Sequence, residues 1–250
     1  MKYTPILIDG AERSGRFVVS CDHASNVVPP SVGGGDLGLP PEDMARHIAW
    51  DPGAWGVSKH LAKLLEAPAI GSNFSRLVID PNRGEDDPTL IMQIYDGSII
   101  PGNRHVDAAE RTRRLEAFYR PYDCALAEKI TPGKALVAVH SFTPQLRGRP
   151  PRPWEIGVLY PTDDRFARPF IARLEAKGDL TVGDNEPYIG YLPGDAVDRH
   201  ATAQGLPNVL IELRNDLIAS EAQQRAWAER LAPLLRGALE DFDQDPAHMS

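Results

Sequence analysis

The stretch Phe17-Val-Val-Ser-Cys-Asp-His-Ala-Ser-Asn26 begins as a short apolar run of β-prone residues and ends abruptly in polar ones. His23 comes just after the apolar run. In α/β proteins, ligands and catalytic groups collect at the carboxyl ends of the strands. The stretch therefore predicts a strand that ends at a functional site, although His23 taken alone is equally consistent with an ordinary loop histidine.

The same pattern, an apolar run followed by chemically active side chains, recurs three times downstream. Residues 135–140 are almost continuously apolar and end in His140, as expected for a central parallel strand covered on both faces. Residues 208–212 end in Glu212, and residues 75–83 read as a strand followed by a polar turn. These runs predict a sheet whose strand ends form one site.

Helical periodicity separates the predicted strands. We expect helices at 53–66, at 164–177 and from Ser220 onward, and a long helix at 107–129 that Pro121 kinks or splits. No internal repeat or long linker divides the 250 residues. The alternation predicts a single α/β domain over 1–250, with its core at about 15–240.

Composition excludes several classes of partner. A net charge of −8 argues against nucleic acid or an anionic membrane as the main partner. No run approaches the roughly 18 apolar residues of a membrane span, and the N-terminus lacks the apolar core of a signal peptide, so we expect a cytoplasmic protein. Cys21 and Cys124 form neither a disulfide framework nor a thiolate metal site. The oligomeric state is not determined by the sequence.

Three of the predicted strand ends carry side chains suited to a metal hydrolase. Imidazoles and carboxylates are preferred zinc ligands, and a catalytic zinc takes three protein ligands and a water. Individually, His23 and His140 could simply bond backbone groups, and Glu212 could pair with Arg214. Their recurrence at strand ends favours a common functional site.

His47 and Asp51 are four residues apart, so they would share one face if residues 44–51 were helical. That spacing would present a metal ligand together with a partner that orients it. Alternatively, Asp51 caps the helix that begins at Gly53, a common role for aspartate. The residues leave both interpretations open.

Arg76, Asn82 and Arg83 lie around the predicted strand at 75–83. A guanidinium group matches the two oxygens of a carboxylate, and a neighbouring amide can complete such a clamp. Simple surface ion pairs with nearby acidic residues are the alternative. A small anionic substrate is therefore compatible with this acidic protein.

With these residues assembled, the chain resembles the N-formylglutamate amidohydrolase family over roughly 17–235. The resemblance rests on His23, Asp51, Ser75-Arg76-x-x-Ile79-Asp80-x-Asn82-Arg83, His140-Ser141, Asn185-x-Pro187-Tyr188 and Ile211-Glu212-x-Arg214. It implies a fold like that of the zinc carboxypeptidases, a three-layer sandwich in which helices flank a mixed, mainly parallel sheet. It also implies one zinc ion at the strand ends.

The resemblance also implies roles for individual residues. His23 and His140 would bind zinc, Glu212 would be the general base, and Arg76 would stabilise the oxyanion. The Asn82-Arg83 pair would bind a substrate carboxylate. The remaining substrate contacts implied by the resemblance are Ser141, Asn185, Tyr188 and Arg214.

The third metal ligand departs from the carboxypeptidase pattern. Carboxypeptidases place a glutamate three residues after their first histidine ligand, and here that residue is Asn26. We expect Asp51 to supply the missing carboxylate, with Asp22 or His47 as substitutes. Other family members read Pro-His-Ser-Gly around this histidine, so the sequence around His23 marks a divergent branch.

The sequence thus predicts a zinc-dependent hydrolase of the amide bond of an N-acyl acidic amino acid, with N-formylglutamate as the family's substrate. A related deacylase or carboxypeptidase and a non-catalytic binder of small carboxylates are the alternatives. An oxidoreductase is disfavoured because no Gly-x-Gly-x-x-Gly turn follows the first strand. The Pro- and Gly-rich segment 27–35 is expected to be a loop beside the site.

Overall fold

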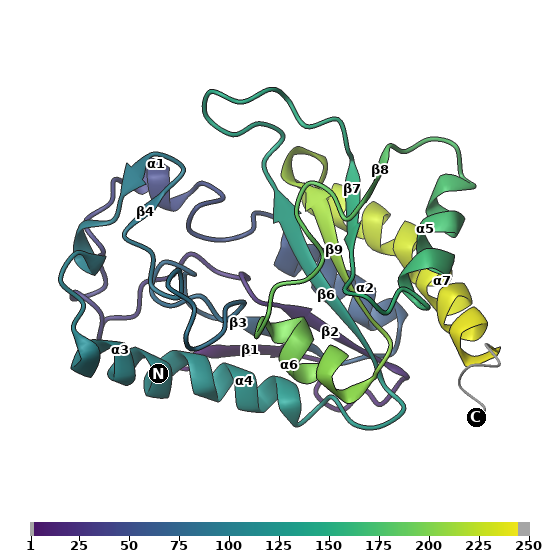
Figure 1. Cartoon of the computed structure of the whole chain (residues 1–250), viewed down its shortest axis with the longest axis horizontal. Coiled ribbons are helices and arrows are strands. Elements are labelled where there is room, and N and C mark those ends of the chain that lie inside the picture. The colour runs from purple at the N-terminus through teal and green to yellow at the C-terminus, as the bar shows by residue number, and fades with distance from the viewer. Residues whose placement is uncertain (1–2, 245–250) are drawn as a thin grey trace.

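The computed structural model describes residues 3–244, in which strands and helices alternate along most of the chain (Figure 1). The strands are β1 (Ile6–Asp9), β2 (Phe17–Cys21), β3 (Ala69–Ser72), β4 (Ile94–Tyr95), β5 (Ser98–Ile99), β6 (Ala135–Phe142), β7 (Ile156–Leu159), β8 (Val182–Asp184) and β9 (Asn208–Arg214). The helices are α1 (Pro41–Met44), α2 (Ala54–Leu64), α3 (Ala108–Arg114), α4 (Arg120–Ala127), α5 (Ala167–Glu175), α6 (Ala196–His200) and α7 (Glu221–Gln244).

The main sheet has seven strands in the order β1-β3-β2-β6-β9-β7-β8, while β4 and β5 form a separate hairpin. Strands β3, β2, β6 and β9 are parallel to one another; β1 is antiparallel to β3, and β7 is antiparallel to β9. Strand β6 is buried at every position, which explains its continuous apolar sequence. The mixed, mainly parallel sheet predicted from the sequence is confirmed.

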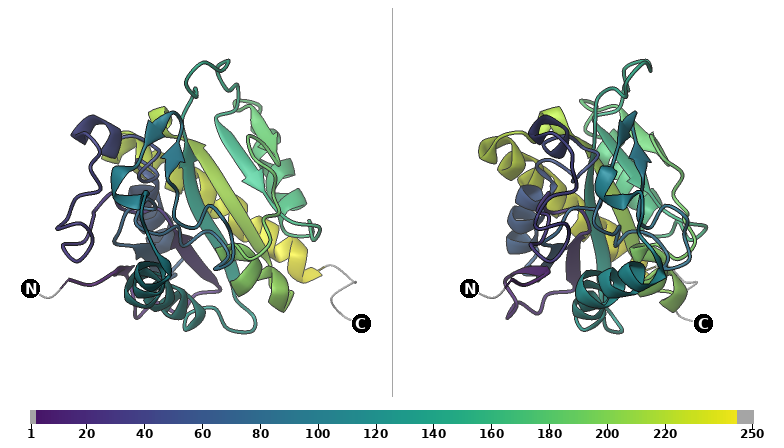
Figure 2. Two further views of the ribbon diagram at one scale, coloured as in Figure 1. Left: turned by 60° about the vertical axis from the view of Figure 1, so that its left-hand side comes forward. Right: turned by 90° about the vertical axis from the view of Figure 1, so that its left-hand side faces the viewer.

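Helices cover both faces of this sheet (Figure 2). Side chains of α2, α5 and α7 pack in one core with Val19 and Val137, whereas those of α4 and α6 pack in a second core with Val18 and Leu136. Successive residues of a strand point to opposite faces, so adjacent residues of β2 and β6 supply different cores. The result is the three-layer sandwich that the resemblance implied.

The parallel strands direct their polar ends to one edge of the sheet. His140 of β6 lies beside Glu212 of β9 in the strand register, and β2 ends at Cys21, immediately before Asp22 and His23. Residues that are about 70 to 190 positions apart in sequence are therefore neighbours in space, as is usual at the carboxyl ends of parallel strands.

The strand predicted in the first part of residues 75–83 is wrong. The strand that joins the sheet is β3, which precedes it, and residues 75–83 form a loop after the end of β3. Leu77, Val78 and Ile79 are buried in the second core without pairing in the sheet. The Ser75 hydroxyl accepts a hydrogen bond from Leu77 N–H, and Val78 N–H donates to Ser75 O, which turns the chain. Apolar composition alone could not distinguish this buried loop from a strand.

The predicted helix at 107–129 is interrupted, as expected from Pro121. A π-helical segment, Leu115–Tyr119, separates α3 from α4, and Arg120 N–H donates to Leu115 O. Proline has no N–H and its ring clashes with the carbonyl four residues earlier, so the wider turn accommodates Pro121 without ending the helix.

The last helix begins directly after Ser220, as predicted. Ser220 and Gln223 form the reciprocal hydrogen bonds of a capping box at the start of α7. Among residues 3–244, no helix is both long enough and apolar enough to cross a membrane.

Candidate metal centre and active site

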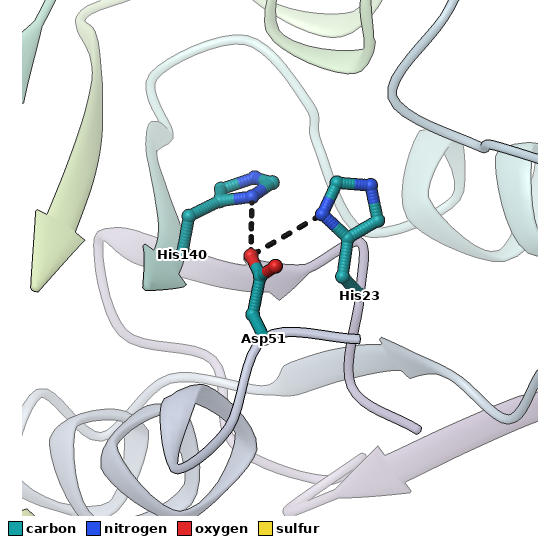
Figure 3. Close-up of side chains that lie close together, drawn as sticks. All are labelled: His23, Asp51 and His140. Carbon is teal, nitrogen blue, oxygen red and sulfur yellow. Dashed lines mark hydrogen bonds and ion pairs between the residues drawn. The ribbon is translucent and has the colours of Figure 1, made fainter. Parts of the chain in front are cut away.

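His23, Asp51 and His140 converge at the carboxyl edge of the sheet (Figure 3). His23 follows β2, Asp51 precedes α2, and His140 lies on β6. The Oδ2 atom of Asp51 lies 3.2 Å from Nδ1 of His23 and 2.9 Å from Nδ1 of His140. One ligand atom from each residue lies within 4.8 Å of the others, and all three side chains are buried. This cluster could hold a single metal ion.

Two further carboxylates bind the outer nitrogens of the same histidines. Nε2 of His23 lies 2.7 Å from Oδ1 of Asp80, and Nε2 of His140 lies 2.9 Å from Oδ2 of Asp22. Tyr122 donates a 2.6 Å hydrogen bond to the other oxygen of Asp22. Each Nδ1 atom also faces a carboxylate, that of Asp51. If a metal ion took the place of these Nδ1 contacts, the carboxylates at Nε2 would hold the protons there and leave the Nδ1 lone pairs to the metal.

The electrostatics of the cluster also suit a divalent cation. Asp22, Asp51 and Asp80 are buried beside the Arg76 guanidinium, so negative charge is in excess around the histidines. Burial opposes the protonation of His140, but its hydrogen bonds to Asp22 and Asp51 raise its pKa well above the usual value. Burial opposes the ionisation of Asp51, but the adjacent histidines lower its pKa overall. Burial also opposes the ionisation of Asp80, and Arg76 holds the pKa of Asp80 well below its usual value. The excess of negative charge and the donor types therefore both fit a zinc ion.

Asp51 does not cap α2. The N-cap residue is Gly53, and no side chain caps this helix. Gly53 has a positive φ of 84°, and a Cβ at this position would lie 2.3 Å from Ile218 O, so glycine is required there. The segment between α1 and Asp51 is not helical, and Asp51 N–H donates a 2.9 Å hydrogen bond to His23 O, which holds Asp51 beside the first histidine.

Arg76 is fixed against this cluster. Its Nε and Nη2 atoms donate hydrogen bonds of 3.1 and 2.7 Å to Asp80, and Nη1 lies 3.7 Å from Oδ1 of Asp51. Its guanidinium also lies 5.3 Å from the ring centre of Tyr95. Arg76 therefore presents a permanent positive charge at a defined position beside the candidate metal ligands.

Glu212 is a buried carboxylate that differs from the three aspartates in its hydrogen bonding. Its Oε2 atom is buried and has no hydrogen-bond partner among residues 3–244. Burial is the largest influence on this group and raises the pKa of Glu212 to about 7. A carboxylate with a pKa near neutrality can both accept and release a proton under ordinary conditions.

These groups line a cavity of about 290 Å³, which we call the main cavity. Arg76, Asn82 and Arg83 line it, as do Ser141 and Tyr188. The Oδ1 atom of Asn82 accepts a 3.2 Å hydrogen bond from Ala196 N–H. The structure therefore brings most of the predicted site residues around one space.

Asn185 and Arg214 lie outside the lining of the main cavity. The Asn185 side-chain oxygen accepts a hydrogen bond from Tyr160 N–H at 3.0 Å. Arg214 donates to Asp216 at 2.9 Å and lies 3.7 Å from Glu155. These contacts support the local fold, and the predicted substrate contacts of both residues stay predictions without geometric support.

The structure also shows where Asp22 and His47, the alternatives for the third metal ligand, lie. Asp22 binds the outer nitrogen of His140, on the side away from Asp51, and His47 lies 3.5 Å from Asp96. Neither joins the group that could hold a metal. The segment 27–35 does not line the main cavity; Tyr188, Ile189 and Leu192 do.

Sequence reasoning missed several residues of the site. Asp80 was assigned no role at the site, and Tyr95, Leu192 and Asp195, which line the main cavity, were not singled out. Asp195 caps α6, and burial raises its pKa to about 6. The sequence signal for Asp80 was its position, four residues after Arg76 in a stretch that carries the resemblance.

Comparison with known proteins identifies the family. The model of the N-formylglutamate amidohydrolase family matches residues 15–219. The chain belongs to this family. It is accordingly an amide hydrolase, as the resemblance implied, and the family supports substrates similar to N-formylglutamate.

Two solved structures are similar to the chain over nearly its whole length. A gene product of Agrobacterium tumefaciens shares 36% identity, with a TM-score of 0.89 and coverage of 97% of both chains. An N-formylglutamate amidohydrolase from Ralstonia eutropha JMP134 shares 21% identity, with a TM-score of 0.69 and coverage of 96% of this chain and 97% of that one. The second likeness shows the fold alone. No curated protein matches the chain.

Proposed function

We propose that this protein is a zinc-dependent hydrolase of the amide bond of an N-acyl acidic amino acid, with N-formylglutamate cleaved to formate and glutamate. The observation that carries the proposal is the buried group of His23, Asp51 and His140, with Glu212 lining the same cavity. Family membership supports the reaction class. The substrate is a small anion, in agreement with the arginines at this site.

His23 and His140, through Nδ1, and Asp51, through its carboxylate, would hold the zinc ion. When bound there, zinc supplies Lewis acidity to the substrate carbonyl and lowers the pKa of water. Asp80 and Asp22 keep the two imidazoles in the required tautomer and orientation.

Glu212 performs the proton transfers of the reaction. As water adds to the formyl carbon, Glu212 takes one of its protons, and when the C–N bond breaks, Glu212 returns the proton to the leaving nitrogen. The raised pKa of Glu212, about 7, matches both steps. Arg76 faces the oxygen on which negative charge develops.

The substrate carboxylate binds at Asn82 and Arg83. Both residues line the main cavity, and the Arg83 guanidinium donates to Thr89 and to Asn82 O, which orients it. Ser141 and Tyr188 line the remainder of the space around the substrate. This arrangement would select acyl amino acids by their carboxylate groups.

The proposal is tested by measuring the release of free glutamate from N-formylglutamate by the purified protein, before and after chelation and zinc restoration. We expect activity that chelation removes and zinc restores, and much slower release from N-formyl-lysine, whose side chain has the opposite charge. Absence of glutamate release from the zinc-loaded protein, or release that chelation leaves unchanged, would contradict the proposal.

A further inference from the structure

A second, larger cleft lies next to the main cavity and is not used by the proposed reaction. Its volume is about 610 Å³, and we call it the side cleft. None of His23, Asp51 and His140 lines it, and neither Asn82 nor Arg83 does. The side cleft is therefore a distinct space that N-formylglutamate, bound at the metal centre and the carboxylate clamp, would not occupy.

The side cleft adjoins the main cavity at three segments of the chain. Asp51 lines the main cavity and the following Pro52 lines the side cleft. In the same way, Phe142 is followed by Thr143 in the loop after β6. On the third segment, Tyr95 of the main cavity is followed by Asp96 of the side cleft. Consecutive residues thus line the two spaces at these three places, so the side cleft lies beside the main cavity.

His47 lines both spaces. Its Nε2 atom is buried and makes no hydrogen bond within residues 3–244, although Asp96 lies 3.5 Å away. Buried polar groups are nearly always hydrogen-bonded, so an unpaired ring nitrogen at the junction indicates a partner that arrives with the ligand. The geometry therefore marks His47 as a contact for the part of a substrate that passes from one space to the other.

The lining of the side cleft indicates what kind of chemical group it would accept. Its charged side chains lie close to opposite charges: Arg46 bonds Asp43 and Asp96 at 2.8 and 2.6 Å, and Asp216 accepts from Arg214 at 2.9 Å. The exposed Arg147 forms a longer ion pair of 3.7 Å with Asp43. The neutral polar side chains in the lining are Thr143, Gln145, Asn215 and Gln224. Such a surface offers hydrogen bonds without a dominant charge, which suits amide groups better than a hydrocarbon chain or an anion.

We infer that the acyl part of the preferred substrate is an amide-bearing, peptidyl-type group that extends past His47 into the side cleft. The enzyme would then release a carboxyl-terminal acidic residue from a short acylated peptide more efficiently than it removes formate. The inference rests on the proposed function, since the same carboxylate clamp and metal centre hold the scissile bond. Two additional hydrogen bonds in the side cleft would raise kcat/KM by about tenfold.

The test compares N-formylglutamate, N-acetylglutamate, N-acetylglycylglutamate and N-octanoylglutamate as substrates, with free glutamate as the readout. We expect N-acetylglycylglutamate to be cleaved with the highest kcat/KM, and N-octanoylglutamate to gain nothing over N-acetylglutamate. The blocking variant is Ala219→Trp, at an exposed position in the side cleft. The matched control is Ala226→Trp, an exposed position of α7 outside both linings.

Ala219→Trp should abolish the advantage of N-acetylglycylglutamate and leave N-formylglutamate cleavage unchanged, while Ala226→Trp changes neither. If N-formylglutamate is cleaved but the longer amide substrate has no advantage, or Ala219→Trp does not reduce that advantage, the inference is overturned and the proposed function stands.

Calorimetric binding in the Glu212→Gln background separates the remaining outcomes. If no substrate is hydrolysed, the proposed function fails. In that case, binding of N-acetylglycylglutamate that Ala219→Trp weakens and Ala226→Trp preserves would still support the side cleft as its binding site. Absence of such binding would overturn the inference as well.

Discussion

Two groups of buried acidic residues surround the main cavity, and their charges are balanced in different ways. Asp22, Asp51 and Asp80 each bond a histidine, and Asp80 also bonds Arg76. These partners outweigh burial, so the pKa values of the three carboxyl groups are lowered, that of Asp80 chiefly by Arg76. Glu212 and Asp195 have no such partners, and burial raises their pKa values to about 7 and about 6. The first group is suited to hold a cation in a fixed geometry, and the second is suited to exchange protons.

This difference explains how one cavity can combine binding and catalysis. A permanently ionised carboxylate is a good ligand but a poor general base, because it holds a proton weakly. A carboxyl group that titrates near neutrality has the opposite properties. The two kinds also act on one another, because the negative charge of Asp51 adds to burial in raising the pKa of Glu212.

The largest expected effect is on catalysis at Glu212. Glu212→Gln keeps the shape of the side chain but removes the proton acceptor, so kcat should fall by about 10²–10⁴. Zinc content, measured by atomic emission, should stay at the wild-type level. Glu175→Gln, at an exposed position of α5, is the matched control and should leave kcat unchanged. Full activity in Glu212→Gln would contradict the claim that the second group of acidic residues exchanges protons.

A second effect concerns stability at Asp195. The folded pKa of about 6 lies above the usual 3.8, so the folded state binds the proton more tightly than the unfolded state does. This contribution to stability is present below pH 3.8 and is lost as the pH rises toward 6. Asparagine can still cap α6 but does not ionise.

Asp195→Asn should therefore be more stable than the wild type above pH 6, by up to about 3 kcal/mol, and the advantage should shrink toward pH 4. Urea unfolding at pH 4 and pH 8 measures the difference. A stability advantage that does not depend on pH would show that burial does not raise the pKa of Asp195 in the folded protein.

A smaller effect is expected at the support of His140. Asp22→Asn removes the charge that fixes the Nε2 proton of His140, and loss of such a supporting carboxylate lowers metal affinity by about 10–100-fold. A competitive zinc titration against a fluorescent chelator measures this change. Asp86→Asn, at an exposed position, should bind zinc as the wild type does. Equal affinity in Asp22→Asn would mean that the outer carboxylates do not support the ligands.

The sequence predicted the architecture well because the strands of a covered parallel sheet are continuous apolar runs. β2, β6 and β9 lie where these runs occur, and His23, His140 and Glu212 meet at one edge of the sheet. Their grouping follows from topology, since parallel strands direct their carboxyl ends to the same side.

The loops could not be predicted in the same way. Asp51 was expected to join the histidines on the strength of the resemblance, and local sequence allowed a helix cap equally well. The contact of Asp80 with His23 depends on a turn at Ser75. The apolar residues after Ser75 predicted a strand there instead. Tyr95 and Asp195 reach the cavity from a hairpin and from the start of a short helix, whose positions depend on tertiary packing.

The most direct test of the central claim is the zinc content of the purified protein after dialysis against metal-free buffer. The account predicts about one zinc per chain in the wild type and in Glu212→Gln, and a loss of most of it in His140→Ala and Asp51→Ala. His105→Ala, at an exposed position, is the control and should retain the zinc. A wild type that holds no more zinc than His140→Ala would contradict the account.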